Sequence, residues 1–209
     1  MPFYFYQTPL WLRRCYPRRT WRIDTHEPIL YLTFDDGPHP TATPFVLDTL
    51  ARFNAKASFF CIGANVVRYP DLYRRICEEG HQVGNHTYHH VNGWKTSTER
   101  YLADIDKASQ HIKSALFRPP YGRITSSQAA ALLQNGPVQQ KIIMWDLLSG
   151  DFDTRLSGED CLSICTKRLR PGSIIVMHDS EKAWPRLSVM LSPLIETAID
   201  RGYRFNILL

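Results

Sequence analysis

Short apolar segments alternate with amphipathic segments along most of this chain, and this alternation constrains its fold more than any other feature. Segments with helical spacing separate short apolar runs that are typical of buried β-strands. The predicted strands are 29–34, 57–62, 82–85, 116–118, 141–145, 173–177 and 203–207, and the predicted helices are 43–53, 71–79, 97–114, 126–134, 158–169 and 187–201. Because parallel neighbours need a long crossover connection, the alternation indicates an α/β fold with parallel strands joined by helices.

Two parallel architectures fit this pattern: an open doubly wound sheet and a closed or nearly closed barrel. No Gly-x-Gly-x-x-Gly follows the first predicted strand, which argues against a dinucleotide-binding sheet. The length of 209 residues is enough for one domain with a sizeable core. No apolar run approaches the roughly 18–20 residues that a membrane-spanning helix needs.

The basic character of the chain is confined to its beginning. The net charge is +5, which equals the contribution of the five arginines that precede the first acidic residue. These arginines are Arg13, Arg14, Arg18, Arg19 and Arg22. Such placement argues against a nucleic-acid partner, which calls for a basic face or stripe. We expect residues 1–28 to form a basic and aromatic extension packed on a domain over 29–209.

A second interpretation of the extension is weak contact with a membrane surface. Aromatic residues at 3–6 would lie in the lipid interface, and the arginines would lie near anionic headgroups. The order of residues is not that of a secretory signal, which places basic residues before about 7–15 apolar ones.

The number of cysteines bears on the compartment. Five cysteines, an odd number, favour free thiols in a reducing compartment. We therefore expect the protein in the cytoplasm or peripherally on the inner membrane face.

Reactive side chains follow five of the predicted strands at the point where each strand ends. Ligands of parallel α/β folds bind at that edge of the sheet. Each cluster alone has an ordinary structural explanation, because Asp and Gly favour turns and histidine pairs often lie on surfaces. Their recurrence at one edge instead indicates a catalytic site. The clusters are Asp35-Asp36, His86 with His90, the stretch 118–122, Asp151, and His178-Asp179.

Two histidines four residues apart and one aspartate can hold a divalent cation and leave coordination positions open for water and substrate. Adjacent side chains in an extended stretch point to opposite sides, so one carboxylate of Asp35-Asp36 can face the metal and the other the water. The second carboxylate is then available as a general base. Zinc is the default ion, and cobalt, nickel or iron suit the same ligands. Iron oxygenases use a similar ligand set, but usually in all-β scaffolds.

Four motifs stand in the order of a known family. They are TFDDGP at 33–38, NHTYHH at 85–90, RPPYG at 118–122 and IVMHD at 175–179. The chain from residue 29 onward thus resembles the polysaccharide deacetylase family, the NodB-homology domain of carbohydrate esterase family 4. The resemblance implies a distorted (β/α) barrel of about seven parallel strands. It also implies metal-dependent removal of acetyl groups from N-acetylated sugars of a glycan, with release of acetate.

The resemblance further implies roles for the two aspartates of the first motif, for two histidines of the second and for the arginine of the third. Asp36, His86 and His90 would hold the metal ion. Asp35 would be the general base that activates water. Arg118 would pair with Asp35 and keep it ionised and oriented, since a nearby cation favours the charged carboxylate.

The later motifs would supply the remaining groups. Tyr121 would offer its backbone N–H to the developing oxyanion. His178 would be the general acid that protonates the departing amine, and Asp151 would orient and charge it. Phe152 stands where the family usually has tryptophan, and Val176 where it usually has the leucine of the acetate methyl pocket. Both are expected to line the substrate site.

Trp94, just past the predicted metal ligands, is expected at the rim as a platform for a sugar ring.

Two alternative functions would use the same site. An O-acetyl (xylan-type) esterase would need less help from the acid, and a non-catalytic, metal-containing carbohydrate-binding protein would need neither acid nor base. The complete set of acid, base and ligands argues against the second alternative. The glycan, the identity of the metal and the oligomeric state are left open by the sequence.

Overall fold

The computed structural model describes residues 4–135 and 140–209. Residues 1–3 of the predicted extension lie outside this described part. The strands are β1 (Arg19–Thr20), β2 (Ile29–Asp35), β3 (Ser58–Cys61), β4 (Gln82–Asn85), β5 (Leu116–Phe117), β6 (Lys141–Ile143), β7 (Leu147–Leu148), β8 (Ile174–His178) and β9 (Arg204–Phe205). The helices are α1 (Leu10–Cys15), α2 (Ala42–Arg52), α3 (Gly63–Arg68), α4 (Pro70–Glu78), α5 (Thr98–Ser109), α6 (Ser126–Asn135), α7 (Gly158–Thr166) and α8 (Trp184–Asp200), with short 3-10 turns η1 (Gly93–Lys95) and η2 (Pro120–Gly122).

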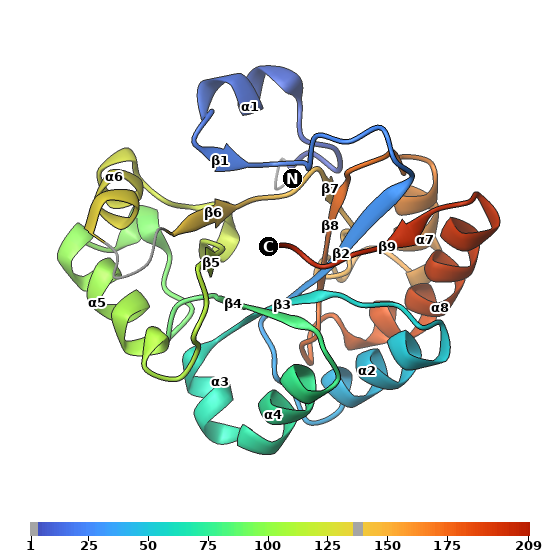
Figure 1. The fold of residues 1–209 in the computed structure, drawn as a ribbon, viewed down its shortest axis with the longest axis horizontal. Coiled ribbons are helices and arrows are strands. Elements are labelled where there is room, and N and C mark those ends of the chain that lie inside the picture. Colours follow the sequence, from blue (N-terminus) through green and yellow to red (C-terminus); the bar gives the residue numbers. More distant parts are fainter. Residues whose placement is uncertain (1–3, 136–139) are drawn as a thin grey trace.

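In the described part of the chain, nine strands form one curled sheet. Its order is β1-β6-β5-β4-β3-β2-β8-β7, with β9 paired to β2, and the named strands pair in parallel throughout. Helices α2 to α8 surround this sheet, and the extension with α1 lies beside β6 (Figure 1). The prediction of a distorted (β/α) barrel of parallel strands is confirmed. Strands β1 and β7 are additional to the seven that we predicted.

Helix ends follow local hydrogen bonding. The Ser97 side chain accepts a hydrogen bond from the Arg100 amide and begins α5, as an N-cap serine does. The helix predicted over 97–114 is shorter than expected, because the amides of His111 and Ile112 both donate to the Ala108 carbonyl and tighten the chain into a turn. Among the described residues, no helix combines the length and the apolar character needed to cross a membrane.

The register of the sheet aligns the carboxyl ends of its central strands. Asp35 at the end of β2 lies opposite His178 at the end of β8. Cys61 at the end of β3 lies opposite Asn85 of β4, and Asn85 lies opposite Phe117 of β5. The residue that follows each of these strands therefore emerges at the same edge of the barrel. This alignment is what brings together motifs that are far apart in the chain.

Apolar side chains fill the interior of the barrel. Tyr31, Phe60, Leu116, Ile143, Ile174 and Leu208 form one buried apolar cluster there. Leu208 belongs to the C-terminal segment, which enters the barrel (Figure 1), and its amide donates to Ser58 Oγ at 3.0 Å. Each such side chain contributes about 1.5–3 kcal/mol on burial. The packed interior leaves the carboxyl edge of the sheet as the open end.

The described part of the N-terminal extension is tied to the barrel by backbone pairing. Its β1 pairs with β6, and Gln7 forms an antiparallel bridge with Leu147. A buried carboxylate, Asp146, adds a charged anchor because it forms ion pairs with Arg13 of α1 and with Arg170. The extension is therefore held at two places along β6 and β7.

We expect Asp146→Ala to lower the free energy of unfolding by about 3 kcal/mol, because it leaves two guanidinium groups without their buried partner. Asp146 is 0% exposed and also accepts a hydrogen bond from Ser173 Oγ at 2.6 Å. Denaturant unfolding at neutral pH measures the change. Asp71→Ala is the matched control, since Asp71 forms an exposed ion pair with Arg74 and exposed pairs contribute about 0–1 kcal/mol. Equal losses in the two variants would contradict the anchoring role of Asp146.

Candidate active site

Three side chains converge at the carboxyl edge of the sheet, just beyond β2 and β4. Asp36 Oδ1 lies 3.2 Å from His90 Nε2 and 3.6 Å from His86 Nε2. One donor atom from each of the three residues lies within 4.8 Å of the others. The structure thus brings together all three residues that we predicted as metal ligands.

The donor atoms of these residues are arranged as a divalent cation requires. His86 Nδ1 lies 2.8 Å from the Arg118 carbonyl oxygen, so its N–H donates there and the Nε2 lone pair is left to face Asp36. Burial lowers the pKa of His86 to about 4, so its ring is neutral at pH 7. Asp36 Oδ1 is buried, and no described residue donates a well-aligned hydrogen bond to it. A buried carboxylate oxygen without a donor beside neutral imidazole nitrogen fits a metal site with open positions.

Asp36 is ionised in this environment. Burial would raise the pKa of its carboxyl group, but interactions with His90, His178 and His86 outweigh burial and hold the pKa well below its usual range. The carboxylate is therefore available as a ligand throughout the neutral pH range.

The backbone around this point is strained. Of the five non-glycine residues with positive φ in the described chain, four lie here: Asp36 (80°), Thr87 (64°), His90 (56°) and Tyr121 (59°). Such conformations cost of order 1–3 kcal/mol each and persist where the surrounding structure enforces them. Here they aim the two histidines and the carboxylate at a common point.

Asp179 supports the loop that carries the two aspartates. Its carboxylate accepts hydrogen bonds from the Gly37 amide at 3.1 Å and from the Thr43 hydroxyl, and its own amide donates to the Asp35 carbonyl at 3.1 Å. A Cβ on Gly37 would lie 2.1 Å from Asp179 Oδ2, so this position accepts only glycine. We assigned Asp179 no role from the sequence; its place beside His178 was the only signal.

Arg118 fixes the predicted base. Its Nη1 donates to Asp35 Oδ1 at 2.6 Å and to Thr33 Oγ1 at 2.8 Å. The other guanidinium nitrogens donate to the carbonyls of Ile143 and Met144 at 3.3 and 3.1 Å. The side chain is fully buried. These four hydrogen bonds hold the planar guanidinium in place, so its Nη1 holds one carboxylate oxygen of Asp35.

His178 is held as a cation at the end of β8, the strand next to that of Asp35. Its Nδ1 lies 2.7 Å from Asp151 Oδ1, and its amide donates to Asp151 Oδ2 at 2.7 Å. Burial lowers the pKa of His178, but the charge and hydrogen bond of Asp151 outweigh burial and raise that pKa to about 10. Phe152 packs on the imidazole with ring centroids 5.5 Å apart. His178 therefore carries a proton at neutral pH.

The ligand set, the base and the acid line one cleft of about 810 Å³, a size typical of ligand sites. Phe152, Val176 and Tyr121 line the cleft, as we predicted. The ring centroids of Tyr121 and His90 are 4.6 Å apart. Lining residues that we did not predict are Tyr4, Asn92, Lys95, Arg123, Trp145, Leu148, Ser180 and Lys182. Several of these closely follow a predicted motif residue, as Asn92 follows His90, Arg123 follows Gly122 and Ser180 follows Asp179, whereas Tyr4 reaches the cleft only through tertiary structure.

One tryptophan and one histidine near the motif residues do not line the cleft. Trp94 is 63% exposed and lies beside the cleft, with the Arg123 guanidinium 4.8 Å from its ring centroid. His89, between the predicted ligands in sequence, pairs with Asp104 through Nδ1 instead. The residues of the NHTYHH motif thus diverge in direction although they are adjacent in the chain.

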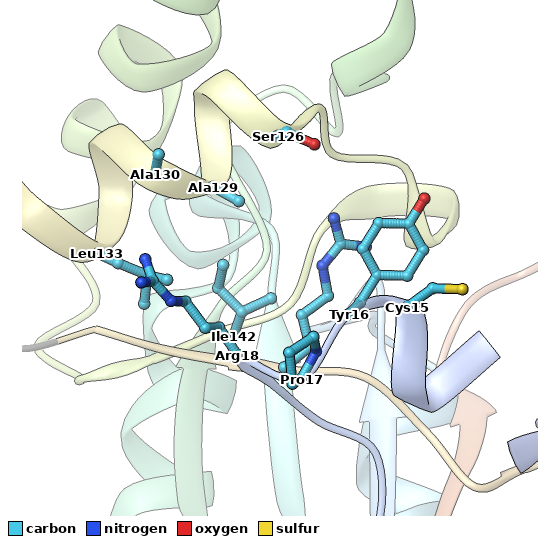
Figure 2. Close-up of a pocket in the computed structure, with 10 residues that line it drawn as sticks. Cys15, Tyr16, Pro17, Arg18, Ser126, Ala129, Ala130, Leu133 and Ile142 are labelled. Carbon is cyan, nitrogen blue, oxygen red and sulfur yellow. The ribbon is translucent and has the colours of Figure 1, made fainter. Parts of the chain in front are cut away.

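A second, smaller hollow of about 240 Å³ lies between the N-terminal extension and α6 (Figure 2). Residues 15–19 form one side, and Ala129, Ala130 and Leu133 of α6 form the other. None of the residues that we predicted for the site lines this hollow. The chemistry therefore belongs to the larger cleft.

Comparisons with known proteins agree on one family. The profile described as polysaccharide deacetylase matches residues 22–138, more than half of the chain. A peptidoglycan-N-acetylglucosamine deacetylase of Bacillus cereus is 32% identical over 192 residues, which cover 89% of this chain and 89% of that protein. A chitooligosaccharide deacetylase of Bradyrhizobium is 35% identical over 157 residues, covering 72% of this chain and 70% of that protein. The crystal structure of a peptidoglycan N-acetylglucosamine deacetylase bound to a substituted benzamide superposes with a TM-score of 0.86 at 30% identity, covering 96% and 95% of the two chains.

Proposed function

The chain belongs to the polysaccharide deacetylase family, and from this we propose that it is a metal-dependent hydrolase that removes acetyl groups from N-acetylated sugars of a poly- or oligosaccharide. One observation carries the proposal. A metal-type ligand set, a base fixed by a buried arginine and a charged imidazole line the same cleft. The named relatives are deacetylases of peptidoglycan and of chitooligosaccharide, which supports an N-acetylated glycan as the substrate.

We propose that Asp36, His86 and His90 hold one divalent cation. The orphaned Asp36 oxygen and the orientation of His86 support this assignment. Zinc is the default ion, and cobalt, nickel and iron suit the same nitrogen and oxygen donors. When bound, the ion would supply Lewis-acid polarisation of water and of the acetamide carbonyl.

The chain's own residues perform the proton transfers in this scheme. Asp35, fixed by Arg118, accepts a proton from the attacking water while the oxygen of that water bonds to the acetamide carbon. The backbone N–H of Tyr121 donates to the developing oxyanion. His178 then gives its Nε2 proton to the sugar nitrogen as the C–N bond breaks, because Asp151 occupies its Nδ1 side. The products are acetate and a free amino sugar.

The charge of His178 supports an amide as the bond that is cleaved. An amine leaves only after protonation, whereas an alkoxide needs less help from an acid. The pKa of His178, raised to about 10 despite burial, keeps that proton in place at neutral pH. This favours the N-deacetylase over the O-acetyl esterase that uses the same site.

We expect Asp151→Asn to lower kcat by about 10²–10⁴-fold and to move the alkaline limb of the kcat profile to lower pH. The sign follows from the pKa: without the carboxylate, the pKa of His178 falls toward or below its ordinary value of about 6.5, so the acid loses its proton earlier as pH rises. The measurement is kcat between pH 6 and pH 10, about the range that the shifted pKa spans.

The matched control is Asp104→Asn, which removes the carboxylate from the His89 pair outside the cleft. This control is expected to leave the alkaline limb at the wild-type pH. An unmoved limb in Asp151→Asn would contradict the assignment of His178 as the acid that Asp151 charges.

Acetate release from a panel of glycans tests the proposed function. N-acetylglucosamine oligomers, peptidoglycan fragments and O-acetylated xylan are each incubated with the protein, with chelator, and with metal restored after chelation. We expect release from N-acetylated glycans that chelator abolishes and metal restores. Release from xylan alone would favour the esterase, binding without release would favour a carbohydrate-binding protein, and insensitivity to chelator would contradict metal dependence.

The charge of the cleft bears on which glycan is bound. Lys95, Arg123 and Lys182 line it from three separate segments, and among residues 4–135 and 140–209 none of them forms a salt bridge. Unpaired cations at a rim favour ligands that carry carboxylates. We therefore propose that the panel will rank peptidoglycan fragments above neutral chitooligosaccharides of equal length.

The predicted contact of the extension with a membrane stays a prediction, as does the predicted location in the cytoplasm or on the inner membrane face. The short helix α1 has apolar side chains that could enter a lipid interface, because Leu10 and Trp11 are 63% and 59% exposed. Arg14 lies on the same helix, where a basic side chain would face anionic headgroups.

A further inference from the structure

The start of the described chain is fixed beside the catalytic cleft. The Leu148 amide of β7 donates to the Tyr6 carbonyl at 2.8 Å, and the Thr8 amide donates to the Asp146 carbonyl at 2.9 Å. These bonds place residues 6–8 along β7, the strand that precedes Asp151, the partner of the acid. Tyr4 lies only two residues before this anchored stretch.

Tyr4 is itself held by specific contacts. Its hydroxyl donates to Asp153 Oδ2 at 2.7 Å, and Arg155 Nε donates to the other oxygen of Asp153 at 2.8 Å. Its ring packs on Phe152 with centroids 5.2 Å apart and on Tyr6 with centroids 5.3 Å apart. Burial and the bond to Asp153 raise the pKa of Tyr4, so the phenol remains a hydrogen-bond donor.

These contacts make Tyr4 part of the cleft wall on the side of the acid. Tyr4, Phe152 and His178 all line the cleft. Phe152 contacts both the His178 imidazole and the Tyr4 ring. The three rings thus form a connected series from His178 through Phe152 to Tyr4, and Tyr4 belongs to the N-terminal extension, which precedes the matched family region.

We propose that Tyr4 is a substrate-contacting residue that binds the sugar next to the one being deacetylated. This proposal rests on the proposed function, in which His178 protonates the nitrogen of the reacting sugar and therefore lies beside that sugar. Phe152 is the next surface along the wall, and Tyr4 lies beyond it. Aromatic rings pack well against the C–H faces of pyranoses, because both surfaces are flat and largely apolar. The extension would thereby select for oligosaccharides over short substrates.

Kinetics on substrates of different length test this assignment. We expect Tyr4→Ala to raise KM for an N-acetylglucosamine hexamer about tenfold, with kcat within about twofold of wild type, because the lost contact is made equally in the ground and transition states. For N-acetylglucosamine itself, which has no neighbouring sugar, kcat/KM should stay within about twofold. Tyr4→Phe retains the ring and should behave as wild type on both substrates. Tyr4→Leu, which retains bulk without a flat ring, should show the loss seen in Tyr4→Ala even if the alanine variant folds poorly.

Trp11→Ala is the matched control, since Trp11 lies in the same extension but does not line the cleft. It should leave both substrates unaffected. Unchanged hexamer kinetics in Tyr4→Ala and Tyr4→Leu, an equal loss on the single sugar and the hexamer, or a comparable loss in Trp11→Ala would each overturn the proposal.

Binding distinguishes failure of this inference from failure of the proposed function. Calorimetric titration of the wild-type chain and of Tyr4→Ala with the hexamer does not require turnover. If no variant releases acetate, the proposed function fails, yet a tenfold weaker Kd in Tyr4→Ala would still support the contact. An equal Kd would overturn it.

Discussion

Replacing Asp35 by asparagine is expected to lower kcat by at least about 100-fold while leaving metal binding intact, because an amide oxygen cannot take the proton of the attacking water. The carboxylate of Asp35 is not needed by the proposed ligand set, which draws on Asp36, His86 and His90. Steady-state kinetics and a metal titration on the same preparation give both values. The two measurements together separate a base from a ligand.

The substitution also removes the partner of the buried Arg118 guanidinium, so a lower melting temperature is expected alongside the kinetic loss. Kinetics should therefore be measured well below the melting temperature of the variant. Asp71→Asn, which alters only an exposed ion pair, should behave as wild type in both assays. Retained turnover in folded Asp35→Asn would remove its assigned role as the base.

Asp36→Ala and His86→Ala are each expected to abolish metal binding and turnover together. Each removes one of three donors that meet within 4.8 Å, and two remaining donors cannot hold the ion at a useful affinity. Metal content after dialysis, measured with acetate release on the same sample, checks the joint loss.

His89→Ala is the matched control for that pair of variants. It removes a histidine adjacent to His90 in sequence, but His89 pairs with Asp104 and takes no part in the cluster. One equivalent of metal and most of the turnover should remain. Loss of metal in His89→Ala with retention in His86→Ala would reverse the ligand assignment.

Much of the architecture could be predicted because it follows from local pattern. Runs such as 29–34 and 173–177 are predominantly apolar, as strands buried on both faces are. Strands β1 and β7 could not be predicted in this way. Each has two residues, and each exists because a distant segment pairs with it, as Arg19 pairs with Ile142.

The candidate site shows the same division. The ligands, base and acid follow strand ends, so their convergence could be expected from the parallel sheet alone. Tyr4 lies in the cleft only because the N-terminal segment packs beside β7, and no spacing connects it to the motifs. The left-handed backbone at His90 likewise carries no signal in a sequence, because it is enforced by surrounding contacts.

Anomalous diffraction from crystals grown with a cobalt salt locates the proposed metal ion. We expect one strong peak per chain, bonded to Asp36 Oδ1, His86 Nε2 and His90 Nε2 at about 2.0–2.2 Å. A peak that contacts none of these atoms, or no peak in crystals of a protein that still releases acetate, would contradict the assigned metal site.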